Sequence, residues 1–245
     1  MKIMSSALPQ TFETILKNMR CPDLLLRYIL VVFVYFACVL SPLFPWFPSS
    51  HQSTAYINTY TAVFFATVII IGLLLLPERR MERSMRASWG ESIAWAICGI
   101  FILYVLQIAA ALINNLILGQ PLSSEHTADI VKMAKTAPLF IFAVSVIGPI
   151  LEEIVFRKIL FGSLKKVIGF IFSAVISSLV FAAGHFDFSH LLIYFVIGFF
   201  LCYAYHKTGR IWVTMFMHAA MNTIVVLLTM NARLPDTTGW IHWLL

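Results

Sequence analysis

The feature that most constrains the fold is a succession of apolar runs, each about as long as a bilayer is thick. A helix of about 20 residues crosses the roughly 30 Å of hydrocarbon in a membrane. Runs of this kind cover residues 24–44, 56–76, 92–118, 137–164, 167–184, 191–205 and 211–230. Backbone polar groups in lipid must be satisfied within the segment, and no run alternates polar and apolar residues. The sequence therefore predicts an all-α, polytopic transmembrane helix bundle.

Composition and charge agree with this class. The chain is 60% hydrophobic and 11% charged, whereas a soluble protein has about 25% charged residues. Basic residues concentrate in short loops, most densely at Arg79, Arg80, Arg83 and Arg86. Such loops usually face the cytoplasm, so we expect a multi-pass protein of the bacterial cytoplasmic membrane with its N-terminus inside. The sequence shows no nucleic-acid-binding signature.

Ionisable residues inside apolar runs cost about 2.5–3.5 kcal/mol each on insertion scales, which makes them candidates for function. The first cluster is Glu152-Glu153-Ile-Val-Phe-Arg157. Glu153 and Arg157 are four residues apart, on one helix face and in the order that favours an ion pair. Glu152 lies about 100° further round the helix without a local partner, which suits a general base for water. The alternative, a solvated structural pair at a helix end, is disfavoured by the apolar flanking residues.

Two later runs carry histidines. His185 closes the motif Phe181-Ala-Ala-Gly184-His185, whose small residues permit close helix approach. Taken alone, His185 is as readily explained as an interfacial residue. His218 and Asn222 are four residues apart in the last run and project from the same helix face. They form either an interhelical hydrogen-bond clasp or a donor pair that stabilises a developing oxyanion.

Together these clusters hold the side chains needed for water activation and oxyanion stabilisation. The sequence thus predicts an intramembrane hydrolase site, whose candidate catalytic residues are Glu152, Glu153, Arg157, His185, His218 and Asn222. Asp187 is a candidate to orient the ring of His185, although solvation in the loop is the simpler interpretation.

The three motifs resemble those of the CPBP family, the CAAX-protease and bacteriocin-processing group that is also called Abi. Its motifs EExxxR, FxxxH and HxxxN are matched in order, within residues 138–230. One such motif would be a weak signal, whereas three in order, each in a helix, are specific. The resemblance implies an intramembrane endopeptidase that acts on a peptide or a membrane protein in the lipid bilayer. It leaves the substrate, the cleavage site and the oligomeric state open.

The resemblance also implies roles for the residues. Glu152 would activate the water with help from His185, Glu153 would be held by Arg157, and His218 with Asn222 would serve the oxyanion. The cofactor stays open, because the family has been interpreted both as metalloproteases and as metal-free glutamate peptidases. A divalent metal such as Zn would have to be bound by Glu152, His185 and His218, which come from three different helices.

The chain divides into N-terminal transmembrane helices and loops at 1–136, a catalytic core at 137–232 and a C-terminal tail at 233–245. The family usually has about eight spans with helix breaks, against seven runs here. A simple count places Glu152 and His218 in the cytoplasmic half and His185 on the far side, yet catalytic residues must meet at one depth. We therefore expect a break or re-entrant turn near Gly148-Pro149, or a span count that is wrong by one.

Two other classes of function remain open from the sequence. A non-proteolytic membrane scaffold or bacteriocin self-immunity protein would keep its activity without Glu152 and His218. A transporter would use Glu152, Glu153 and Arg157 as an ion path, but the chain lacks the repeated half that is common in transporters.

Overall fold

The computed structural model describes residues 22–48, 50, 53–77, 86–120 and 125–231. Within these residues the regular structure is helical, without strands, as the sequence predicted. The long helices are α2 (Pro22–Val39), α3 (Thr54–Leu75), α4 (Trp89–Leu116), α8 (Gly162–Ala183), α9 (Leu191–Thr208) and α10 (Ile211–Asn231). Shorter elements are α5 (Glu125–Thr136) and the single turns η1 (Ser41–Leu43) and η5 (Phe188–His190).

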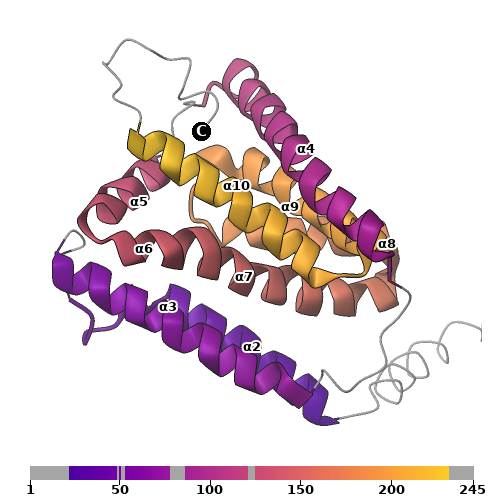
Figure 1. The fold of residues 1–245 in the computed structure, drawn as a ribbon, viewed down its shortest axis with the longest axis horizontal. Helices are drawn as coiled ribbons and strands as arrows, with labels where there is room; N and C mark the ends of the chain where they lie inside the picture. Colours follow the sequence, from indigo (N-terminus) through magenta and orange to yellow (C-terminus); the bar gives the residue numbers. More distant parts are fainter. Residues whose placement is uncertain (1–21, 49, 51–52, 78–85, 121–124, 232–245) are drawn as a thin grey trace, which may run out of the picture.

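A continuous helical stretch runs through the middle of the molecule. It consists of α6 (Pro138–Phe142), η3 (Ala143–Ile147), α7 (Gly148–Glu152) and η4 (Glu153–Phe161). The pair of α2 and α3 lies along one side of this stretch, and α10 crosses it on the other side (Figure 1). Helices α8 and α9 lie behind α10 in this view and α4 runs along the upper right, with α8 packed on η4 and α4 packed on α9 and α10. The central stretch is therefore in contact with both halves of the bundle.

The membrane-spanning character of these helices follows from their length and composition. Five helical stretches are long and apolar enough to cross a bilayer: Thr54–Leu75, Trp89–Leu116, Pro138–Ala183, Phe188–Thr208 and Ile211–Met230. A shorter apolar helix covers Leu24–Val39. The stretch Pro138–Ala183 has 46 residues and contains two of the predicted runs. Each predicted run therefore corresponds to a helix, and the chain is a multi-pass membrane protein.

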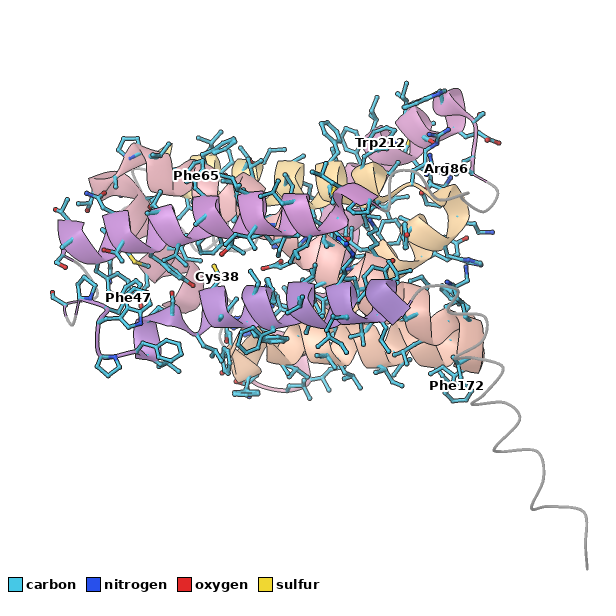
Figure 2. All side chains as sticks on the ribbon, turned by 90° about the horizontal axis from the view of Figure 1, so that it is seen from below. Cys38, Phe47, Phe65, Arg86, Phe172 and Trp212 are labelled. Atoms are coloured by element: carbon cyan, nitrogen blue, oxygen red, sulfur yellow. The ribbon has the colours of Figure 1, made fainter. Side chains whose placement is uncertain are left out.

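The helix ends that border the basic loops gather at one end of the bundle (Figure 1). The side chain of Arg27, in the first turns of α2, donates from Nη1 to the carbonyl of Leu74 at the end of α3, at 3.2 Å. Arg210 precedes α10 and donates from Nε to the carbonyl of Ala87, just before α4, at 3.0 Å. Arg86 and Trp212 also lie close together there (Figure 2). Such clustering is typical of a cytoplasmic face.

The predicted break at Gly148-Pro149 is absent, because the backbone stays helical there, with φ −52° and ψ −60° at Gly148. Instead the helix widens into π-helical turns on both sides, at 143–147 and 153–161. The amide of Gly148 donates to the carbonyl of Ala143, five residues back. A proline cannot donate and its ring collides with the carbonyl four residues back. A wider turn before Pro149 accommodates both effects without ending the helix.

The chain reverses direction at Gly169 instead. This glycine has φ 77° and ψ −178° inside the stretch that α8 covers, a conformation that is essentially restricted to glycine. The helical arm after the turn packs back on the arm before it. The rings of Phe161 and Phe170 are 5.8 Å apart, and the hydroxyl of Ser177 donates to the carbonyl of Phe156 at 2.8 Å. The two arms are therefore antiparallel.

This reversal removes the conflict of depth that the sequence posed. Glu152 lies 17 residues before Gly169 (169 − 152), and His185 lies 16 residues after it (185 − 169). At a rise of about 1.5 Å per helical residue, both lie about 25 Å from the turn. Antiparallel arms of equal length bring the two residues to one level of the membrane.

Candidate active site

Glu153, Arg157 and His218 form a buried polar cluster between η4 and α10. Arg157 Nη1 lies 3.1 Å from Glu153 Oε1, and both side chains are 0% exposed. The ion pair predicted from the spacing is therefore present. His218 Nδ1 donates to the same carboxylate oxygen at 3.0 Å. The guanidinium carbon of Arg157 also lies 4.2 Å from the centre of the Phe181 ring, which adds a cation–π contact in a site where water is scarce.

Glu152 points to a different part of the same site. Its Oε2 lies 3.7 Å from Nε2 of His218, and its side chain is 20% exposed, whereas that of His218 is 3% exposed. Within the described residues Oε2 has no hydrogen-bond partner. The imidazole of His218 thus lies between the two glutamates, bonded to Glu153 through one ring nitrogen and facing Glu152 with the other. Glu152 is the accessible carboxylate of the pair.

His185 reaches the site from the end of the second arm. Its Nδ1 lies 2.9 Å from the carbonyl of Phe181. A carbonyl oxygen only accepts, so Nδ1 carries the proton and Nε2 of the neutral ring is an acceptor. The ring stacks on Tyr194 with centroids 4.1 Å apart. Phe181 separates the two histidines, with ring centroids 4.6 Å from His185 and 5.7 Å from His218.

Four of the six predicted catalytic residues are in direct contact in the structure, and His185 and Asn222 are not. Glu152, Glu153, Arg157 and His218 are in direct contact, and His185 approaches them through Phe181. Asn222 lies one turn after His218 on α10 and is half-buried. In the described part of the chain, the hydrogen bonds and ion pairs do not connect Asn222 to the cluster. Its share in the chemistry stays a prediction.

The residues present do not fit a metal ion in this arrangement. Over the described ranges, no three His, Cys, Asp or Glu side chains gather closely enough to hold one. The bonds from Nδ1 of His218 to Glu153 and from Nδ1 of His185 to a backbone carbonyl leave this question open, because metal-binding histidines commonly make such bonds with their other nitrogen. The metal site of Glu152, His185 and His218 therefore stays a prediction.

Neighbouring residues complete the site, and sequence reasoning found only part of them. Asp187 is hydrogen-bonded to His190, whose Nδ1 donates to Oδ1 at 2.9 Å. The sequence pointed to Asp187 but not to this partner. The stacking of Tyr194 on His185 was missed, because an aromatic residue near a helix start reads as an ordinary interface residue. Asn114 is buried and donates to the carbonyl of Ser189 at 2.8 Å, which ties α4 to the segment after His185.

Comparison with known proteins places the chain in a family. The family model for type II CAAX prenyl endopeptidase Rce1-like proteins matches residues 134–224. Over 175 residues, 39% are identical to the putative membrane peptidase YdiL of Bacillus subtilis, covering 70% of this chain and 72% of that protein. The chain belongs to the membrane CAAX protease family. The CPBP resemblance read from the three motifs is thereby confirmed.

A second relative of this CAAX protease is the membrane-embedded CAAX protease MroQ of Staphylococcus aureus. It is 34% identical over 167 residues, which cover 66% of this chain and 68% of MroQ. No solved structure matches the chain significantly. The membrane CAAX protease family is one of hydrolases, and these two bacterial relatives agree with a multi-pass protein of a bacterial membrane.

Proposed function

We propose that this membrane CAAX protease is an endopeptidase that hydrolyses a peptide bond with a water activated by Glu152. The observation that carries the proposal is the position of His218 between Glu152 and Glu153. It places the Glu152 carboxylate beside an imidazole whose orientation is fixed by its bond to Glu153. A base and an electrophilic group at one point are what attack of water on a carbonyl requires.

In the proposed reaction, Glu152 accepts a proton from water while the oxygen attacks the carbonyl carbon of the substrate. Nε2 of His185 is an acceptor for the second proton of the same water and so orients it. The oxyanion of the tetrahedral intermediate then collapses, the C–N bond breaks, and the leaving nitrogen takes the proton from Glu152, which restores that carboxylate. No step is assigned to a metal, because the ligands do not converge. Metal analysis of the purified protein tests that choice independently.

The oxyanion would be stabilised from α10. Nδ1 of His218 donates to the ionised Glu153, so a proton on Nε2 makes the ring cationic and turns it into a donor. The Glu153 carboxylate stabilises that cation, and Arg157 balances the charge of Glu153. Asn222, one turn further on, would add its amide as the second donor. The buried pair thus serves to orient and polarise His218.

The proposed substrate is a peptide or a membrane-protein segment that reaches the depth of Glu152. Similarity to a protein named as a membrane-embedded CAAX protease supports this class. Leader peptides, pheromone precursors and lipoproteins are the candidate substrates in a bacterial membrane.

The experiment compares the membrane proteome and secreted peptides of cells that carry the wild-type, Glu152→Ala or His185→Ala protein. Glu91→Gln is the matched control, because Glu91 is an exposed residue that caps the start of α4. We expect uncleaved substrate to accumulate with the first two variants, with a rate lowered about 100- to 10,000-fold, which is typical for loss of a general base. Unchanged processing in Glu152→Ala cells would refute proteolysis. Protection or signalling that survives loss of both Glu152 and His218 would favour the scaffold or immunity function.

A further inference from the structure

One face of the central helix is turned toward α2 and α3. Gly148, Glu152 and Phe156 are spaced by four residues and share this face. The ring of Phe64 on α3 lies 3.5 Å from the place that a Cβ on Gly148 would occupy. The ring of Tyr35 on α2 packs edge-on against Phe156, with centroids 5.8 Å apart. Glu152 lies between these two contacts and therefore faces the N-terminal helix pair.

Two tyrosines of that pair lie in the same region as Glu152. Tyr35 is 7% exposed, and Tyr60 is half-buried, with its ring edge-on to Phe64 at 4.9 Å. Both phenols interact electrostatically with Glu152, and Tyr35 also interacts with Tyr60. Cys38, which also interacts electrostatically with both phenols, lies between α2 and α3 (Figure 2). The two hydroxyls therefore belong to one region, next to the accessible carboxylate.

These hydroxyls are polar atoms in an otherwise apolar wall. Among the described residues, no hydrogen bond ends on the hydroxyl of Tyr35 or Tyr60. A phenylalanine would fill the same space, and a buried tyrosine hydroxyl normally finds a partner. A bound peptide has the complementary need, because its backbone N–H and C=O groups must be satisfied once they leave water.

We propose that Tyr35 and Tyr60 form a second polar wall of the peptide-binding site and hydrogen-bond the main chain of the substrate. His218 and Asn222 on α10 form the first wall, and Glu152 lies between the two. This inference rests on the proposed endopeptidase function and extends it to α2 and α3, which carry none of the three motifs. The substrate segment then lies against Glu152, in an extended form that exposes its carbonyl groups.

The first test uses Tyr35→Phe, Tyr60→Phe and the double variant, with Tyr203→Phe as control. Tyr203 packs on Trp95 and Phe170, away from Glu152. The probe is a synthetic copy of the peptide that accumulates in Glu152→Ala cells, cleaved by each full-length variant in liposomes. We expect KM to rise about fivefold for each lost hydroxyl, as for one hydrogen bond between neutral groups, with kcat within about twofold. Tyr203→Phe should leave both constants unchanged.

The second test places a photoreactive benzoyl-phenylalanine at position 35 or 60 of the Glu152→Ala protein in cells. Phe33 and Ile69 serve as control positions on the same helices, because they are 69% and 61% exposed. Cross-links to the accumulating peptide are expected from positions 35 and 60, and cross-links to lipid from positions 33 and 69. Capture of the peptide at all four positions, or at none, would refute the proposed contact of Tyr35 and Tyr60 with the substrate.

The outcomes separate the two proposals. If Glu152→Ala cells accumulate no peptide, the endopeptidase function is refuted, and with it the proposed role of Tyr35 and Tyr60 in binding its substrate. If a peptide accumulates but the tyrosine variants cleave it with an unchanged KM, the endopeptidase stands and only the wall is refuted. A fall in kcat at constant KM also refutes it, because a binding wall acts before the chemical step.

Discussion

Replacing Arg157 with methionine tests how the buried cluster is held together. Methionine is flexible and apolar, so it fills the fully buried place of the Arg157 side chain. The positive charge beside Glu153 is removed. Glu153 then remains buried at 0% exposure, with only His218 as a partner. We expect Arg157→Met to be strongly destabilising, because an uncompensated charge in a low-dielectric site is more costly than a missing contact.

The magnitude follows from the geometry. Two unit charges 3.1 Å apart attract each other by about 5 kcal/mol at an effective dielectric constant of about 20, from 332/(20 × 3.1). Removal of one member of a buried pair is known to cost about 3–5 kcal/mol. For a chain of this size, each kcal/mol corresponds to about 2–4 °C in Tm. Arg157→Met should therefore lower Tm by about 6–20 °C.

The assay is thermal unfolding in detergent followed with a thiol-reactive dye. Cys38 and Cys202 are 3% and 0% exposed, so they react only when the bundle opens. Replacing Cys21 and the exposed Cys98 by serine leaves Cys38 and Cys202 as the two reporting thiols.

A double variant, Glu153→Gln with Arg157→Met, sharpens the test. It removes both charges and keeps an oxygen for His218 Nδ1, so it should recover at least half of the stability lost in Arg157→Met. A single variant as stable as the wild-type protein, or a double variant less stable than the single one, would refute the role assigned to the ion pair.

Two further predictions concern the helical scaffold. Ser177→Ala removes the hydroxyl that donates across to the Phe156 carbonyl, and should cost about 1 kcal/mol together with reduced processing. Ser178→Ala, whose hydroxyl bonds within its own helix to Ala174, should keep processing normal; equal effects would contradict a special role for Ser177. Gly169→Ala should cost about 1–3 kcal/mol, because φ 77° with ψ −178° strains any residue with a Cβ. Gly72→Ala is the matched control, since Gly72 lies in α3 with open space around it, and it should stabilise by up to about 1 kcal/mol. Similar Tm values for the two glycine variants would show that the turn is not strained.

The chemistry of the candidate site was largely readable from the sequence. Spacing by four residues fixes which side chains share a helix face, so the Glu153–Arg157 pair followed from local geometry. The orientation of His218 did not. Its partner lies 65 positions away in the chain (218 − 153), and which ring nitrogen meets which glutamate depends on how α10 crosses the central helix.

The depth of His185 shows the same limit. Both Gly148-Pro149 and Gly169 are plausible places for a break, because glycine and proline punctuate helices alike in a sequence. The structure keeps the helix through Pro149 by widening it, and turns the chain at Gly169, where φ is positive. The choice depends on packing of the two arms, which includes the bond from Ser177 to the freed carbonyl of Phe156.

The sequence by itself determined the membrane class, the helical architecture, the family and the spacing that pairs Glu153 with Arg157. These properties follow from hydrophobicity and from the 3.6-residue period, which act over one or two turns. Only the tertiary structure decided that Glu152 and His185 share a depth, that His218 lies between the two glutamates, and that Tyr35 and Tyr60 lie in the region of Glu152. Such contacts are set by helix packing between distant segments, and the local pattern of residues does not encode them.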